Sequence, residues 1–116
     1  MLKDSEKETV LCCRALGTWG PDAQVLMMFE EMAELQKELC KHARGKDNRE
    51  HIAEEIADVE IMLHQMMILF DCEDLVRGIK KMKLKRLGER LEEAEEATLP
   101  PLTRSPSPYA GEAYGE

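Results

Sequence analysis

A chain of 116 residues has room for one helical core but not for a catalytic domain beside a regulatory one. Aromatic residues make up only 4% of it, and the abundance of Glu, Leu, Lys, Ala and Met favours an all-α fold. The formal net charge of −8 argues against a nucleic-acid binder, because phosphate backbones are held mainly by Lys and Arg.

The first predicted element is a short amphipathic helix over residues 6–16. A loop over residues 17–22 follows, because it contains two glycines and a proline, and Asp22 is a candidate cap for the next helix. From residue 23 to residue 43, apolar side chains recur at three- and four-residue spacing. They predict a core-facing stripe of Val25, Met28, Met32, Leu35 and Leu39.

A turn is predicted over residues 44–48, where a glycine is followed by the two capping residues Asp47 and Asn48. The second main helix is predicted over residues 49–70, and its stripe is Ile52, Ile56, Val59, Leu63, Met66 and Phe70. Asp71 is the predicted cap of a third helix over residues 73–96. The pattern predicts an antiparallel bundle of three main helices plus the short N-terminal helix.

The second main helix carries more apolar residues than one stripe needs, since Ile61, Met62, Ile68 and Leu69 fall outside it. We therefore expect oligomerisation to complete the bundle, as a homodimer or a dimer of dimers. The alternative is that the N-terminal segment covers the extra surface. Residues 1–96 form one predicted all-α domain, and residues 97–116 form a predicted disordered tail that contains Pro, Ser and Gly.

The cysteines and the apolar stretches indicate a cytoplasmic protein. No Cys-x-x-Cys pair occurs, and no His is spaced along the sequence to complete a zinc site. We expect reduced thiols, with Cys40 and Cys72 as small buried groups. No membrane association is expected, because the longest apolar stretch, residues 66–70, is far shorter than the roughly 20 residues that span a bilayer. The N-terminus lacks an apolar signal core.

An acidic motif occurs twice, as Glu30-Glu31-x-x-Glu34 and as Glu54-Glu55-x-x-Asp58. The last two acids of each copy, Glu31 and Glu34 or Glu55 and Asp58, have the same two angular offsets from the apolar stripe of their helix. If the helices pack antiparallel, the carboxylates converge on one cleft and repel each other unless a cation lies between them. Hard oxygen ligands favour Mg²⁺, with Mn²⁺ possible, over zinc.

The third predicted helix is rich in Lys and Arg between residues 77 and 90. Lys83 and Arg86 share one helical face, so both side chains can reach a polyphosphate. Beside an acidic metal site, they favour a substrate that carries phosphate.

The paired motif resembles that of the MazG-like all-α nucleoside triphosphate pyrophosphohydrolases, in particular the small phage and prophage forms. The family signature is Glu-Glu-x-x-Glu, a spacer, and Glu-x-x-Asp. It is matched here by residues 30–34 and 55–58, and the resemblance extends over residues 19–91. The element Lys83-Leu84-Lys85-Arg86 is similar to the family's Lys-Phe-x-Arg, although Lys81 stands where the family often has an Asn.

The resemblance implies Mg²⁺-dependent hydrolysis of a nucleoside triphosphate to its monophosphate and pyrophosphate. It also implies that the metal ligands are Glu31, Glu34, Glu55 and Asp58, and that Lys83 and Arg86 contact the phosphates. Glu30 or Glu34 is the predicted carboxylate that orients a metal-activated water.

Base recognition is assigned to Trp19, which can stack on a base, and to Gln24, which can hydrogen-bond to its edge. The alternative for Trp19 is that it closes the end of the bundle.

Two other functions are compatible with the sequence. A di-iron or manganese carboxylate bundle also uses paired carboxylates, but it requires Glu-x-x-His elements, and Glu60 and His64 are four residues apart. The second alternative is a non-enzymatic helical interaction protein whose acidic and basic faces pair with partner helices.

Overall fold

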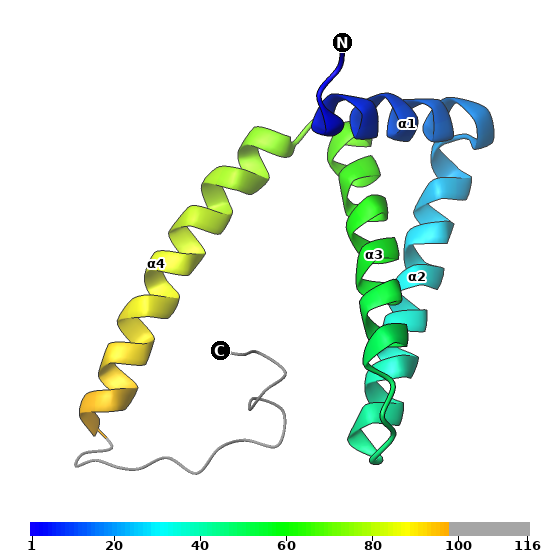
Figure 1. Ribbon diagram of the computed structural model, residues 1–116. Helices are drawn as coiled ribbons and strands as arrows, with labels where there is room; N and C mark the ends of the chain where they lie inside the picture. Colours follow the sequence, from blue (N-terminus) through cyan, green and yellow to red (C-terminus); the bar gives the residue numbers. More distant parts are fainter. Residues whose placement is uncertain (98–116) are drawn as a thin grey trace. The chain divides into compact units, whose positions relative to one another are not determined.

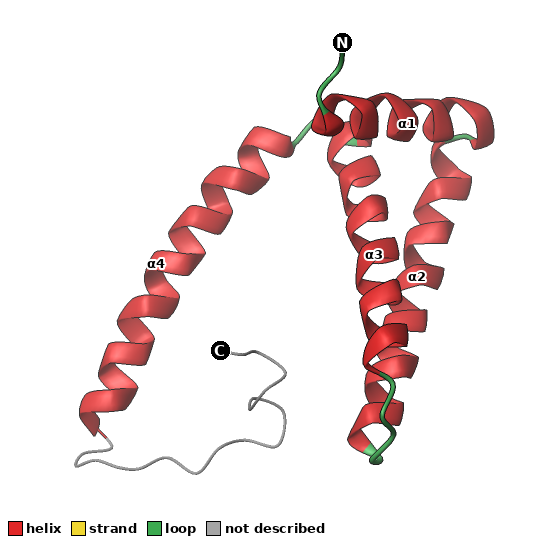
Figure 2. Cartoon of the chain, in the orientation of Figure 1, coloured by secondary structure: helices red, strands yellow, loops and turns green. Residues whose placement is uncertain are grey.

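The computed structural model describes residues 1–97 and is all-helical, as predicted. The helices of this part are α1 (Asp4–Trp19), α2 (Pro21–Ala43), α3 (Arg49–Leu69) and α4 (Glu73–Ala97), shown in Figure 2. The predicted tail lies outside the described residues, apart from Ala97 at the end of α4.

The chain divides into two compact units, Met1–Val76 and the residues from Arg77 onward. In the first unit, α2 and α3 form an antiparallel hairpin, and α1 lies across its end (Figure 1). This helix contacts both α2 and α3. The second unit contains most of α4, and none of the residues of α4 is buried.

The junction of α1 and α2 is shorter than predicted. Helix α1 continues through Gly17 to Trp19, and only Gly20, at φ 90°, separates it from α2. Pro21 then occupies the first turn of α2, where its fixed φ suits a helix and its missing N–H costs no hydrogen bond. The predicted loop over residues 17–22 and the capping role of Asp22 are therefore wrong.

The two helices of the hairpin, α2 and α3, have the same hydrogen-bond pattern at their C-terminal ends. Gly45 (φ 97°) follows α2 and donates to the His42 carbonyl, while Lys46 donates to the Lys41 carbonyl. After α3, Asp71 (φ 49°) and the next residue repeat the pattern. This is the Schellman motif, which favours glycine at the left-handed position. Asp71 ends α3 in this way, and Cys72, not Asp71, precedes α4.

The buried faces of α2 and α3 differ in phase from the predicted stripes. Helix α2 buries Gln24, Met28 and Glu38, whereas Met32 and Leu39 are 44% and 47% exposed. Helix α3 buries Met62 and Gln65. Its exposed residues include three members of the predicted stripe, namely Ile56, Leu63 and Phe70. In both helices the buried face therefore includes residues that come one position before a member of the predicted stripe. This rotation turns the polar edge of each helix toward the other helix.

The left-handed conformation of Asp71 yields a test of the helix-ending motif. Replacing Asp71 with Gly removes the steric cost of a Cβ at φ 49° and should raise the free energy of unfolding by about 0.5–1 kcal/mol. Gly45→Ala, the matched change at the other motif, should lower it by about 1 kcal/mol. Urea unfolding measures both, and a destabilised Asp71→Gly variant would contradict the assignment.

Candidate metal centre and adjoining groove

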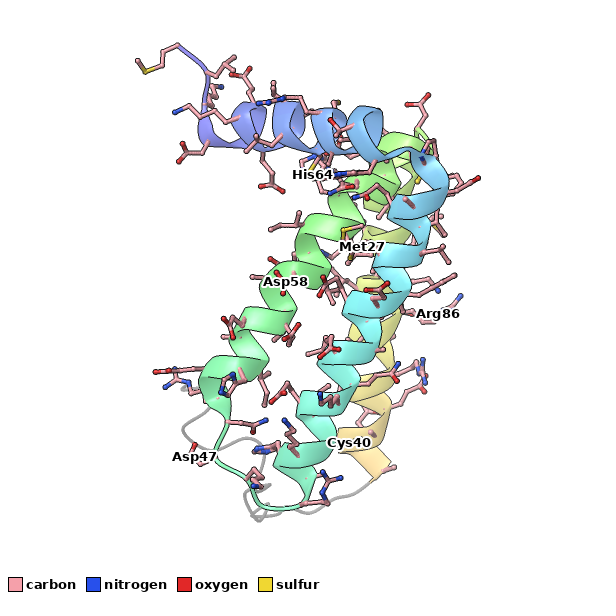
Figure 3. All side chains as sticks on the ribbon, turned by 90° about the vertical axis from the view of Figure 1, so that its right-hand side faces the viewer. Met27, Cys40, Asp47, Asp58, His64 and Arg86 are labelled. Carbon is pink, nitrogen blue, oxygen red and sulfur yellow. The ribbon has the colours of Figure 1, made fainter. Side chains whose placement is uncertain are left out.

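Three carboxylates of the repeated acidic motif meet between α2 and α3. One oxygen from each of Glu31, Glu55 and Asp58 lies within 4.8 Å of the other two. Glu31 comes from α2 and the other two from α3, where Asp58 lies midway along the helix (Figure 3). The antiparallel packing brings the two copies of the motif together because both helices turn their polar edge inward.

The environment of these carboxylates opposes their negative charge. The Oε1 atom of Glu55 is buried, and no hydrogen bond from the described residues reaches it. Desolvation raises the pKa of Glu55, and the charges of Asp58 and Glu31 raise it further. Desolvation likewise raises the pKa of Glu31, with added repulsion from Asp58 and Glu34. Every charged neighbour that shifts these two pKa values is itself an acid.

Another buried acid, Glu38, shows the contrast. The Asn48 side-chain amide donates to Glu38 Oε1 at 2.8 Å and to the Glu38 backbone carbonyl at 2.9 Å, while Lys41 Nζ lies 3.2 Å from Oε2. These partners, Asn48 foremost, lower the pKa of Glu38. Asn48 precedes α3 as predicted, but its amide fastens the turn to α2 instead of capping α3. The first unit thus compensates the charge of Glu38, whereas no hydrogen bond or ion pair found among its described residues does the same for Glu31 or Glu55.

A divalent cation fits the cluster of Glu31, Glu55 and Asp58. It would offset the charge of the acids that raise the pKa values of Glu31 and Glu55, and it would give the buried Glu55 Oε1 a partner. An all-oxygen donor set suits a hard cation such as Mg²⁺ or Mn²⁺. The donor types are therefore those that a hard cation uses, and the metal itself stays a prediction.

The other predicted acidic residues lie outside this three-residue cluster. Glu34 is exposed, and its charge contributes to the raised pKa values of both Glu31 and Glu55. Its assignment as a fourth metal ligand stays a prediction. Glu30 is also exposed, and it contributes to the raised pKa of Glu31. Both side chains are open to solvent near the cluster, as a residue that orients water must be.

A groove of about 500 Å³ adjoins the cluster, and Glu31 and Asp58 form part of its wall. The remaining wall is mostly apolar and consists of Trp19, Ala23, Gln24, Met27, Ile61, Met62 and Gln65. The volume lies in the range of small-molecule sites. The structure thus brings the predicted base-recognition residues and two predicted metal ligands to one groove.

The two predicted base-recognition residues differ in their surroundings. Trp19 is 65% exposed and forms part of the groove wall, and both its stacking role and the alternative that it closes the end of the bundle stay predictions. Gln24 is buried, and its Nε2 donates to Gln65 Oε1 at 2.7 Å. Sequence reasoning missed Gln65. The only available signal was a polar residue among the apolar residues near the end of the helix.

Lys83 and Arg86 lie on α4, within the second unit. With four other residues of this helix they line one shallow hollow of about 380 Å³, so they share a face as predicted. Their predicted contact with phosphate stays a prediction.

The cysteines are distributed differently from the prediction. Cys40 is exposed and Cys72 only partly covered, whereas Cys12 is the buried cysteine, at 2% exposure. None of the four, all of which belong to the described residues, forms a disulfide. The predicted burial of Cys40 is wrong because the buried face of α2 passes through Glu38 instead.

Comparisons with protein-family models, with curated proteins and with solved structures found no match to this chain. No helix among residues 1–97 is long and apolar enough to cross a membrane.

The raised pKa of Glu55 predicts that the metal-free protein loses stability as the pH rises and Glu55 becomes charged. Because its pKa is higher in the folded chain than the ordinary value of 4.5, the folded state binds more protons than the unfolded state just above that pH. The contribution of Glu55 to the free energy of unfolding is fully present below about pH 4.5, where its carboxyl group is protonated in both states. This contribution is lost as the pH rises through the folded pKa.

Replacing Glu55 with Gln removes this charge and should raise the melting temperature in EDTA at about pH 7, with a smaller gain near pH 4.5. Glu60→Gln, at an exposed position of α3, is the matched control and should change little. Thermal unfolding followed by circular dichroism measures both variants. An equal gain at the two pH values would contradict the assignment.

Proposed function

We propose that this chain is a Mg²⁺-dependent nucleoside triphosphate pyrophosphohydrolase, similar to the MazG-like enzymes, that releases a monophosphate and pyrophosphate. The observation that carries the proposal is the cluster of Glu31, Glu55 and Asp58 at the wall of a mostly apolar groove. A hard-cation site suits the phosphate chain of such a substrate, and the groove suits its base and sugar.

In this proposal Glu31, Glu55 and Asp58 hold the cation, and Glu34 is the predicted fourth ligand. When bound, Mg²⁺ neutralises charge on the phosphoryl oxygens and lowers the pKa of a water molecule. Glu30 or Glu34, both exposed beside the cluster, orients the attacking water and accepts its proton. No covalent nucleophile is required.

The groove supplies contacts for the nucleoside. The exposed indole of Trp19 stacks on the base, and the hydrogen bond between Gln24 and Gln65 presents their remaining amide groups to its edge. Lys83 and Arg86, on the helix of the second unit, stay the proposed phosphate contacts, because two cations on one helical face can form charge-assisted hydrogen bonds to phosphate oxygens.

One histidine argues against a di-iron or manganese carboxylate bundle. His64 Nδ1 lies 2.6 Å from Glu8 Oε2, so this histidine pairs with α1 instead of joining the cluster of Glu31, Glu55 and Asp58. The alternative of a non-enzymatic helical interaction protein does not explain the buried Glu55 Oε1 atom.

Replacing Asp58 with Asn should lower the rate of pyrophosphate release by about a hundredfold or more, because a metal ligand loses its charge. The assay screens a panel of nucleoside triphosphates with Mg²⁺ and identifies the nucleotide product. Glu60→Gln should retain activity, and circular dichroism should show unchanged helix content in both variants. Equal activity of the Asp58→Asn variant would refute the site assignment.

We further propose that the bundle is completed by a homodimer or a dimer of dimers. Large apolar side chains are exposed on both helices of the hairpin, among them Leu26 (59%), Phe29 (61%) and Leu63 (46%). In a monomer these groups face water, and burying them against a second copy would stabilise the assembly.

Sedimentation equilibrium at micromolar concentration should therefore show a dimer or tetramer. Replacing Phe29 with Lys should shift the equilibrium toward the monomer, because a charge would be buried in the interface. Leu2→Lys, at the exposed N-terminus, should leave the assembly unchanged. Finding only monomer for the unmodified chain would contradict the proposal.

A further inference from the structure

A second cluster of potential metal ligands lies where α1 crosses α3, away from the acidic centre. It consists of Glu8 and Cys12, one helical turn apart on α1, and of His64 on α3. One ligand atom from each lies within 4.8 Å of the other two. Figure 3 shows His64 directly beneath α1.

The three side chains are held in place by the fold. His64 Nδ1 lies 2.6 Å from Glu8 Oε2, and the Thr9 hydroxyl lies 3.2 Å from Nε2 of the same ring. Cys12 is 2% exposed, and the hydrogen bond that its Sγ makes within residues 1–97 is weak, at 4.0 Å from the Ile61 carbonyl oxygen. A thiol is thus buried beside a carboxylate and an imidazole, with no strong hydrogen bond of its own.

We infer that Glu8, Cys12 and His64 form a binding site for Zn²⁺ or a similar borderline transition-metal cation. One sulfur, one nitrogen and one oxygen donor match the ligand types of zinc, whereas Mg²⁺ prefers oxygen alone. Three protein ligands leave a fourth tetrahedral position open. This site is chemically distinct from the cluster of Glu31, Glu55 and Asp58, and it does not depend on the proposed enzymatic activity.

The distances allow an ion to enter with small side-chain movements. Zinc bonds of about 2.0–2.3 Å place tetrahedral ligand atoms roughly 3.3–3.8 Å apart. The present spacing, within 4.8 Å overall and 2.6 Å between His64 and Glu8, brackets that range. Binding releases the proton of the Cys12 thiol to solvent. If Nδ1 is the ligand atom, the proton of the neutral imidazole resides on Nε2, where the Thr9 hydroxyl oxygen can accept its hydrogen bond.

The surroundings of Cys12 disfavour a thiolate when no cation is bound. Burial raises the pKa of the Cys12 thiol, and the negative charge of Glu8 raises it further. A cation between the two groups offsets both effects and stabilises the thiolate. Because Glu8 and Cys12 belong to α1 and His64 to α3, binding also ties these two helices together.

Cobalt(II) is a suitable probe, because a cobalt–thiolate bond produces a charge-transfer band in the near ultraviolet and a carboxylate site does not. The full-length chain titrated with Co²⁺ under reducing conditions should develop this band, and stoichiometric Zn²⁺ should abolish it. Competition with a chromophoric chelator then measures the affinity for Zn²⁺, and the melting temperature should rise with Zn²⁺.

The variants separate this site from the neighbouring thiol and from the acidic centre. Cys12→Ser should abolish the band, whereas Cys13→Ser, at the adjacent exposed cysteine, should keep it. Glu55→Gln should also keep it. If Cys12→Ser fails to fold, His64→Gln decides the question, and its affinity for Zn²⁺ should fall by about tenfold or more.

Three results would overturn the inference. They are the absence of a thiolate band in the unmodified chain, a band that persists in Cys12→Ser, and a His64→Gln affinity equal to that of the unmodified chain. Any of these would leave Glu8, Thr9 and His64 as a hydrogen-bonded tether between α1 and α3.

Discussion

The packing of α2 against α3 through their polar edges is the constraint on which the rest of the first unit depends. Because Gln24 and Glu38 are buried on α2 and Gln65 on α3, each helix turns its acidic motif toward the other. The same rotation leaves large apolar groups such as Phe29 and Leu63 facing outward. The carboxylate cluster and the exposed apolar surface thus have one cause.

This packing divides the acids of the hairpin into two kinds. Glu38 receives hydrogen bonds from Asn48 and an ion pair from Lys41, so it fastens the turn to α2 at little electrostatic cost. For Glu31 and Glu55, desolvation raises the pKa values, and the charges of neighbouring acids raise them further. Residues that lower stability in this way are typical of sites that bind a ligand or a substrate. The proposed cation would remove the conflict.

Local sequence signals predicted the helices but not the details of their packing. The spacing of apolar residues located α2, α3 and α4 to within two residues, since a period of 3.6 is a local property. It failed for the buried faces, because exposed Met32 and Ile56 fit a stripe as well as buried Met28 does. Apolar periodicity cannot distinguish a surface that packs within the chain from one left outside it.

The two clusters of potential ligands differ in how far the sequence could predict them. Glu31, Glu55 and Asp58 were predictable because a repeated motif with matched phase marks two neighbouring helices. Cys12 and His64 carry no such signal, since they lie far apart in sequence and meet only because α1 crosses the end of α3. The spacing of Cys and His in the sequence does not indicate this cluster, because its three residues come close together only when the chain folds.

Titrating the full-length chain with Mn²⁺ tests whether Glu31, Glu55 and Asp58 form a divalent-cation site. Electron paramagnetic resonance of free Mn²⁺ measures the bound fraction. We expect saturable binding that Mg²⁺ displaces, and an affinity at least about tenfold weaker in the Glu55→Gln variant, while Glu60→Gln binds as the unmodified chain does. Equal Mn²⁺ affinity in the unmodified and Glu55→Gln chains would contradict the proposed site.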